Sequence, residues 1–406
     1  AFVIGMLAET TLGFVFDLLH IRPLYFFILA SILSLIYVYY QFNQKNKDLL
    51  AFSNNAFRNL HWAEVAIFIM IVIKIMMVFA NWVILPQYFD DSMRHWSGRS
   101  RALFGGENWS LDPDSINLLG KQFGHYEYPL MSVIWRANSA WMNGEWNALI
   151  ARADSFIFFL ILLYGVFYLV NYLSKKRWVA FSAVILTCAV PIQFAHAASG
   201  YMEIALQSLS VLFLISLLNR EYFLAGFMTA AVVFAKNEGF VLYLPLFFII
   251  AVWYSYKLDN KLKTFSQNLL KYLLATFILL IPWIIFKLIY NVPFATPTKA
   301  EYYYHEGSLG LYLKFIFDSP SSSIFWTMIF VFMLLSAKRI IHSIQLQTIT
   351  LLLFGLLTAF FIVFAFTGAN IFMVNQTTIH RTMLQIIPVG IILISSCMSD
   401  SFQTHQ

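Results

Sequence analysis

Apolar runs of about 20 residues dominate the chain, separated by short polar connections and by one long polar loop. A helix rises about 1.5 Å per residue, so runs of this length match the roughly 30 Å hydrocarbon core of a bilayer. The pattern predicts an all-α polytopic membrane protein with about twelve transmembrane helices. We expect these helices at residues 1–19, 22–40, 64–86, 154–173, 178–195, 202–218, 222–238, 239–255, 270–290, 322–337, 347–367 and 381–398.

Composition agrees with this interpretation. Hydrophobic residues make up 60% of the 406 residues and charged residues only 11%. A soluble domain carries about 25% charged residues, so this chain lacks the polar surface that water requires. The net charge of +6 does not indicate a nucleic-acid partner, because membrane proteins concentrate Lys and Arg in their cytoplasmic connections.

The basic residues of the short connections predict the topology. In the twelve-helix arrangement, every basic cluster in a short connection falls on the same side, which is therefore expected to be cytoplasmic. These residues are Lys45, Lys47, Arg58, Lys175, Lys176, Arg177, Arg220, Lys257, Lys261, Lys263, Lys338 and Arg339. The opposite side then holds a large first outer loop, residues 87–153.

This topology divides the chain into three parts. Residues 1–60 would form two extra N-terminal helices and a cytoplasmic loop, residues 61–398 the main transmembrane module, and residues 399–406 a cytoplasmic tail. Lys74 lies in the middle of the third expected helix, and a pairing with Glu9 or Asp17 would account for it.

The candidate chemistry gathers at the outer ends of the helices. The long loop opens with two adjacent carboxylates, Asp90 and Asp91. Charged side chains at membrane depth are costly and usually face a polar cavity or a partner. Further charged or titratable residues are expected at this same face: Glu203, Lys236, Glu238, Lys287, His380 and Arg381.

The order of these elements resembles the GT-C superfamily of membrane glycosyltransferases, most closely the branch of protein O-mannosyltransferases and lipid A aminoarabinose transferases. The resemblance spans about residues 64–398. It rests on Asp90-Asp91, on Tyr128-Pro129-Leu130 after His125 and Glu127, on Ser199-Gly-Tyr-Met-Glu203, on Lys236-Asn-Glu-Gly239, and on His380-Arg381 with Pro388. The chain departs from the family where Thr382 replaces a common aromatic residue and where a single proline, Pro129, replaces a pair.

The resemblance implies transfer of a sugar from a polyprenyl-phosphate carrier to a lipid, glycan or protein acceptor. The enzyme would lie in a plasma or inner membrane, with its active site on the extracytoplasmic face. Asp90 or Asp91 would act as general base, and Arg381, Lys236, His380 and Lys287, with Lys299 as a further helper, would hold the donor phosphate. His125, Glu127, Tyr128, Glu203 and Glu238 would contact substrate. The two aspartates either repel, which raises the pKa of one of them, or share a divalent cation; no other cofactor is expected.

Structural roles are the alternative for each motif. Asp90-Asp91 would cap a helix beginning at Ser92, Glu203 would face a helix dipole, and Lys236 and Glu238 would form an ion pair. His380-Arg381 would anchor a helix end at the interface, and His125 and Glu127 would make loop contacts. For the whole chain, the rival functions are a transporter or lipid-carrier permease and a non-catalytic subunit of a membrane complex.

Overall fold

The computed structural model describes residues 2–18, 60–87, 90–105, 127–259, 261–294, 302–318 and 323–398. Within these ranges the regular structure is helical throughout, with no strand. The helices are α1 (Phe2–Leu18), α3 (Trp62–Ile84), η1 (Ser92–Gly98), α4 (Arg99–Gly105), α5 (Met131–Asn143), α6 (Ala148–Ala151), α7 (Ala153–Ser174), α8 (Arg177–Ala189), α9 (Pro191–Ser199), α10 (Glu203–Leu218), α11 (Tyr222–Ala235), η3 (Gly239–Tyr243), α12 (Leu244–Leu258), α13 (Leu262–Ile289), α14 (Ser308–Asp318), α15 (Ser323–Leu335), α16 (Ala337–His342), α17 (Ile344–Phe366), α18 (Asn370–Val374), α19 (Ile379–Leu384) and α20 (Ile387–Cys397).

Six helical segments of the described chain are long and apolar enough to cross a membrane. A seventh would be the pair α8 and α9, and shorter apolar helices lie within 2–15, 203–218, 222–235 and 324–335. Helices therefore occupy every predicted span that lies in the described residues. The predicted span at 22–40 lies outside them, and the total of twelve stays a prediction.

One predicted span is wrong in shape. The run at 178–195 is not a single helix, because α8 and α9 meet at Val190 with a bend of 74°. Pro191 begins α9, and a proline both lacks a backbone N–H and disfavours helical geometry in the residue before it. The bend carries the end of α9 toward the segments that hold the charged side chains.

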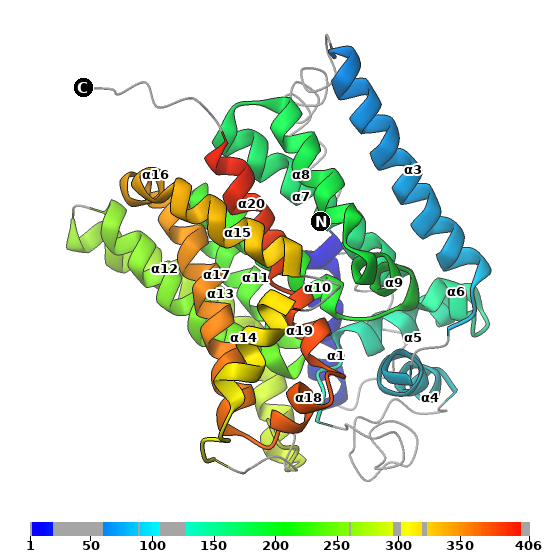
Figure 1. Ribbon diagram of the computed structural model, residues 1–406. Helices are drawn as coiled ribbons and strands as arrows, with labels where there is room; N and C mark the ends of the chain where they lie inside the picture. Colours follow the sequence, from blue (N-terminus) through cyan, green and yellow to red (C-terminus); the bar gives the residue numbers. More distant parts are fainter. Residues whose placement is uncertain are drawn as a thin grey trace.

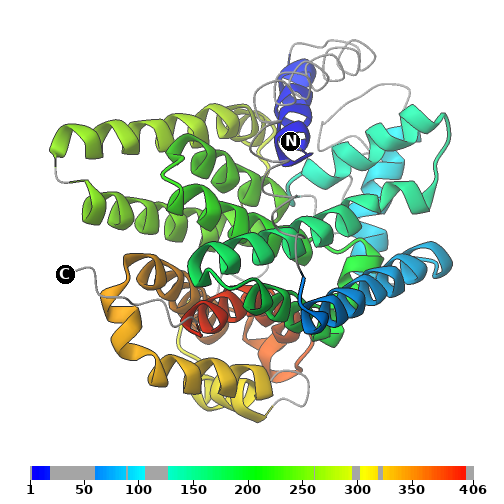
Figure 2. The same cartoon turned by 90° about the horizontal axis from the view of Figure 1, so that it is seen from above.

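The bundle has a buried centre and an exposed outer helix. Most of the segment containing α19 and α20 is buried, 89% of its apolar window, whereas only 17% of the corresponding window in α3 is buried. Figure 2 shows α3 on the periphery of the bundle. The backbones of α11 and α13 approach each other closely at Gly226. A Cβ atom at this position would lie 2.3 Å from the carbonyl oxygen of Tyr272, so the contact requires a glycine. Small residues allow such packing where helices associate in a membrane.

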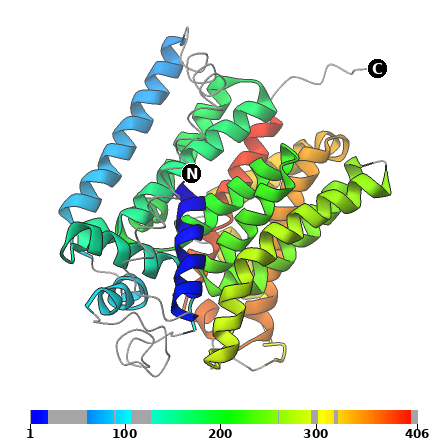
Figure 3. The same cartoon turned by 180° about the vertical axis from the view of Figure 1, so that it is seen from behind.

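The two ends of the bundle carry different elements. In Figure 1, α16 and the connection between α7 and α8 lie at the upper end, whereas α4 and α18 lie at the lower end. Figure 3 shows the same separation from behind. The long loop of the prediction contains η1, α4, α5 and α6, and α4 and α5 pack against each other. The loop thus places the start of η1 beside the end of α9 and the first turn of α19.

The first helix packs against its neighbours at the edge of the bundle (Figure 2). α1 packs against α5, α11 and α13, and the Glu9 carboxylate accepts a hydrogen bond from the Asn138 side chain at 3.3 Å. Lys74 lies on α3, which packs mainly against α8 and α9. Among the described side chains Lys74 has no carboxylate within ion-pair distance, so the expected pair with Glu9 is not formed. The side chain of Asp17 lies outside the described set.

Candidate functional site

Four separate segments bring five charged side chains together, which we call the charge cluster: Asp91, Glu203, Lys236, Glu238 and Arg381. Asp91 precedes the π-helical turn η1, Glu203 begins α10, Lys236 and Glu238 lie between α11 and η3, and Arg381 lies in the first turn of α19. Segments separated by up to 290 positions thus meet at one place.

Glu203 is the centre of the cluster. Its Oε1 accepts a hydrogen bond from Lys236 Nζ at 3.1 Å and another from Arg381 Nε at 3.0 Å. Lys236 also pairs with Glu238 Oε1 at 2.9 Å. Burial disfavours the ammonium form of Lys236, but the two carboxylates outweigh that effect and hold its pKa above the ordinary value. Lys236 is therefore a fixed positive charge.

The cluster has a closed side and an open side. The side chains of Glu203 and Lys236 are 0% and 3% exposed, whereas those of Arg381 and Asp91 are 18% and 30% exposed. Arg381 Nη1 donates to Asp91 Oδ2 at 2.5 Å on this open side. A ligand that approached from outside would meet the Asp91–Arg381 contact first.

Two rings border the open side. Tyr201 stacks on His196 with ring centroids 4.4 Å apart, and the Arg381 guanidinium carbon lies 4.9 Å from the centre of the Tyr201 ring. His196 Nδ1 lies 3.9 Å from Glu203 Oε2. Burial raises the pKa of the Tyr201 phenol to about 12, so this ring is neutral. The rings restrict the orientation of Arg381 through stacking and a cation–π contact.

The two neighbouring aspartates separate. Asp90 points outward and pairs with Arg94 at 2.6 Å, with both side chains about two-thirds exposed, 66% and 70%. Asp91 turns inward to Arg381, and His95 Nε2 lies 3.7 Å from its other carboxylate oxygen. The helix-cap interpretation is wrong, because Asp91 makes no side-chain capping hydrogen bond and already has helical dihedral angles.

A second buried network, which we call the arginine brace, holds this region in place. It consists of Arg136 and Asp154 with Ser97 and Gly200: Arg136 makes two hydrogen bonds of 3.0 Å to the Asp154 carboxylate. The same guanidinium donates to Ser97 Oγ at 3.0 Å and to the Gly200 carbonyl at 2.7 Å. The brace therefore joins η1 to the turn that precedes Glu203.

The turn itself requires a glycine. Gly200 has a φ of +84°, and a Cβ there would lie 2.8 Å from Ser92 Oγ. Ser92 Oγ donates to the Ser199 carbonyl at 2.5 Å, so η1 lies directly on the turn. Only a residue without a side chain adopts this left-handed conformation at so close an approach.

Lys287 is held by contacts outside the charge cluster, whereas Tyr128 borders the cluster. The Tyr128 ring centroid lies 5.7 Å from that of His95, which faces Asp91. Lys287 Nζ donates to the carbonyls of Glu127 and Pro293 at 2.8 and 2.7 Å. The carbonyl of Tyr128 accepts from Arg99, and its ring stacks on Trp96 at 5.6 Å. Burial lowers the pKa of Arg99 to about 10.

The two remaining histidines have different outcomes. His380 contacts the Phe315 ring edge to face at 4.7 Å, one residue before Arg381. His125 lies outside the described residues.

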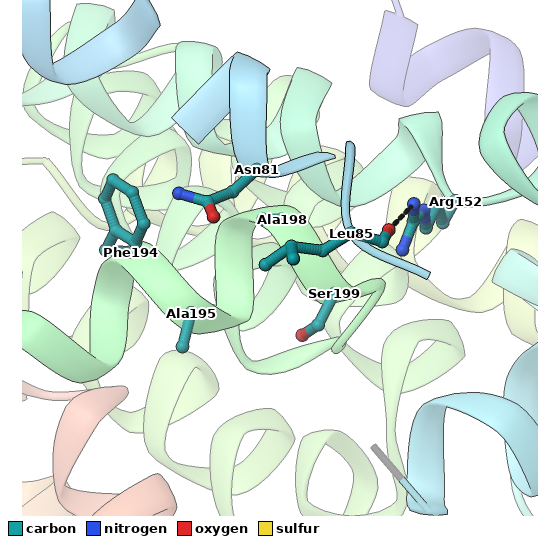
Figure 4. Close-up of a pocket in the computed structure, with 7 residues that line it drawn as sticks. All are labelled: Asn81, Leu85, Arg152, Phe194, Ala195, Ala198 and Ser199. Carbon is teal, nitrogen blue, oxygen red and sulfur yellow. Dashed lines mark hydrogen bonds between the residues drawn. The ribbon is translucent and has the colours of Figure 1, made fainter. Parts of the chain in front are cut away.

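A small cavity lies behind the site. It encloses about 70 Å³ and is lined by Asn81, Leu85, Arg152, Phe194, Ala195, Ala198 and Ser199 (Figure 4). The Leu85 carbonyl accepts a hydrogen bond from Arg152 Nη2 at 2.5 Å (Figure 4). No member of the charge cluster lines this cavity, although Ser199 connects it to η1.

The sequence-based argument missed the arginine brace. Arg136 and Asp154 are separated by 18 positions and resemble ordinary interfacial charges. A usable signal is that Arg136 lies among the residues of α5 that are expected to be buried, with Val133, Ile134 and Ala137 close by in the sequence. A charge in such a position requires a partner.

The two aspartates are not part of a metal-binding group in the described part of the chain. Within the described residues, no group of three or more His, Cys, Asp or Glu side chains is arranged to hold a metal ion. Asp90 and Asp91 direct their carboxylates to different arginines. A cation at this site stays a prediction.

Comparison with protein-family models, curated proteins and solved structures found no match for this chain.

Proposed function

We propose that this protein is a GT-C-type membrane glycosyltransferase that moves one sugar from a polyprenyl-phosphate donor to an acceptor hydroxyl. The observation that supports this most is the accessible Asp91–Arg381 contact on the open side of a buried cluster of matched charges. A carboxylate beside a fixed guanidinium supplies a proton acceptor and a phosphate ligand within one small volume.

The proposed reaction needs both groups. The acceptor hydroxyl oxygen attacks the anomeric carbon of the sugar and its proton passes to the Asp91 carboxylate. The bond between the anomeric carbon and the phosphate oxygen breaks, and the electron pair remains on the polyprenyl phosphate. Arg381, held by Glu203 and stacked near Tyr201, stabilises the charge that develops on that phosphate.

The donor would also activate the base. Without a ligand, Arg381 is shared between Asp91 and Glu203. A phosphate that binds Arg381 on the open side takes the place of Asp91, while the buried contact with Glu203 keeps the guanidinium oriented. Asp91 then becomes available to accept the proton of the hydroxyl group, so donor binding and base activation are one event.

The arrangement of the bundle supports an extracytoplasmic site. Two basic segments, α16 and the connection between α7 and α8, lie at one end, and α4 of the long loop lies at the other (Figure 1). With the positive end in the cytoplasm, the charge cluster faces outward. In this proposal the chain has twelve spans, including one at 22–40, and lies in a plasma or inner membrane.

The aspartate pair supplies a matched test. Purified protein would be mixed with undecaprenyl phosphate linked to each of several monosaccharides, and release of undecaprenyl phosphate would be measured by mass spectrometry. Asp91→Asn should lower turnover 10²–10⁴-fold, the usual contribution of a positioned base. Asp90→Asn, one residue away and outside the cluster, should retain turnover near that of the parent protein.

Two outcomes contradict the proposal. One is equal loss in the two variants, which would indicate a general effect of charge in this loop. The other is the absence of turnover with every donor in the parent protein, combined with loss of a co-purifying membrane protein in Asp91→Asn. That result would favour the alternative in which this chain is a non-catalytic subunit of a membrane complex.

A further inference from the structure

An apolar groove lies on the outside of the bundle, and no residue of the charge cluster lines it. α15 contributes Phe330 and Leu334 to its wall, α16 contributes Ala337, Ile340 and Ile341, and α17 contributes Phe354. The groove encloses about 310 Å³, and every side chain that lines it is apolar. Leu334 and Ile341 are 78% and 66% exposed, so the groove is accessible from outside the protein.

Hydrocarbon is the expected content of such a groove. Apolar cavities do not hold ordered water, because a buried water needs two or more polar partners. The volume is about twenty times the roughly 10–15 Å³ that a cavity needs to hold one water molecule. In a bilayer, the apolar groups available to fill the groove are lipid acyl chains.

The groove lies beside the first half of α17. It extends from α16 to Phe354, which lies ten residues after the start of α17 at Ile344. Ten residues of helix span about 15 Å, half of a hydrocarbon core of about 30 Å. An acyl chain between α16 and Phe354 would therefore lie within one leaflet.

The end of the groove carries positive charge. α16 contains Lys338, Arg339 and His342 within six residues. Arg339 contacts the Cys397 carbonyl and so fixes α16 against the end of α20. Lys338 is exposed and follows Ala337 directly, and no described carboxylate pairs with it. Among the described side chains, no carboxylate competes with an anion for this ammonium.

We propose that this groove binds one anionic phospholipid, with an acyl chain along Phe330 and Phe354 and the phosphate beside Lys338. Basic residues at a membrane surface attract anionic headgroups, and the apolar groove adds selectivity for a lipid over a soluble anion. The site lies at the end of the bundle where α16 and the α7–α8 connection are found, opposite α4 and α18. It does not depend on the proposed glycosyltransferase activity.

Native mass spectrometry of the full chain in detergent tests this proposal with phosphatidylglycerol and phosphatidylcholine as probes. The parent protein should retain one phosphatidylglycerol in preference to phosphatidylcholine. Lys338→Gln should weaken retention of phosphatidylglycerol about fivefold and leave phosphatidylcholine unchanged, since one basic side chain near a membrane surface contributes about this factor. Ala337→Trp fills the groove and should remove the bound lipid whatever its headgroup.

Controls separate the groove from general effects. Lys257→Gln removes a basic residue from the last turn of α12, a helix that does not line the groove, and should change the retention of neither lipid. Leu334→Trp provides a second filling variant if Ala337→Trp does not fold. Equal retention of both lipids by the parent protein would overturn the proposal, as would unchanged retention in a folded filling variant. Displacement of phosphatidylglycerol by undecaprenyl phosphate would overturn it too and would assign the groove to the donor tail.

Discussion

The arginine brace and the charge cluster both contain an Arg–carboxylate contact, yet their surroundings differ. In the brace, Arg136 and Asp154 are completely buried, and one guanidinium meets one carboxylate with two hydrogen bonds. In the charge cluster, three carboxylates share two cations, and the Asp91–Arg381 contact is partly exposed. A buried pair with equal and opposite charges stabilises the structure. A partly exposed cluster with more carboxylates than cations can instead bind a ligand.

The two networks meet at the turn containing Gly200. The carbonyl of Gly200 accepts from Arg136, and Glu203 follows three residues later at the start of α10. The brace also holds Ser97, five residues after Ser92 in the turn that Asp91 precedes. The rigid network therefore determines where the carboxylates of the open network lie.

The largest effect on stability is expected from Asp154→Asn. This change leaves the Arg136 guanidinium buried without a full counter-charge, which costs about 3–5 kcal/mol. Denaturant titration of the purified protein in detergent would measure the loss. The double variant Arg136→Met with Asp154→Leu should recover most of it, because removing both charges removes the unpaired one. Equal instability of the single and double variants would mean that the brace does more than balance charge.

Glu203→Gln should have a smaller effect on stability and a large effect on the site. Lys236 keeps Glu238 and Arg381 keeps Asp91, so the expected loss is about 1–3 kcal/mol, the cost of one unmet buried contact. The neutral side-chain amide of the Glu203→Gln variant would no longer hold Lys236 and Arg381 by charge, so turnover of the donor should also fall. A stability loss as large as that of Asp154→Asn would contradict the distinction between the two networks.

The smallest effect is expected at the exposed pair. Arg94→Gln breaks the contact with Asp90, in which both side chains are mostly exposed, and pairs of this kind contribute about 0–1 kcal/mol. The unfolding midpoint and the donor turnover should both stay near the parent values. A large loss of turnover would place this surface pair in substrate binding and would remove Asp90→Asn as a neutral control.

Local sequence patterns located most of the helices but not their bends. Apolar runs predict helices such as α7 and α17 closely, since residues 154–173 and 347–367 lie within or nearly within Ala153–Ser174 and Ile344–Phe366. The break at Val190 and the early end of α11 at Ala235 were missed. At Val190 the apolar run continues while the backbone changes direction, and a hydropathy pattern records only the run. At Ala235 the helix ends where Lys236, Asn237 and Glu238 interrupt the apolar run, and the expected span extended through these polar residues.

The sequence identified most residues of the candidate site but not which of them contact one another. Charges at the ends of apolar runs drew attention to Glu203, Lys236 and Arg381, because such charges need partners. Which partners they have depends on how α10, α11 and α19 pack. Lys287 carries the same signal in the sequence, yet its ammonium is bound by two backbone carbonyls.

The sequence by itself determined that this is an all-α chain rich in membrane-length apolar helices, because composition and run length depend only on residue order. Tertiary structure alone decided that Asp91 and not Asp90 faces Arg381. Successive residues on a helical turn point in directions roughly 100° apart, so the side chains of two adjacent aspartates face different parts of the structure. Their different roles follow from what lies on each side of the turn: solvent and Arg94 on one, and the packed ends of α10 and α19 on the other.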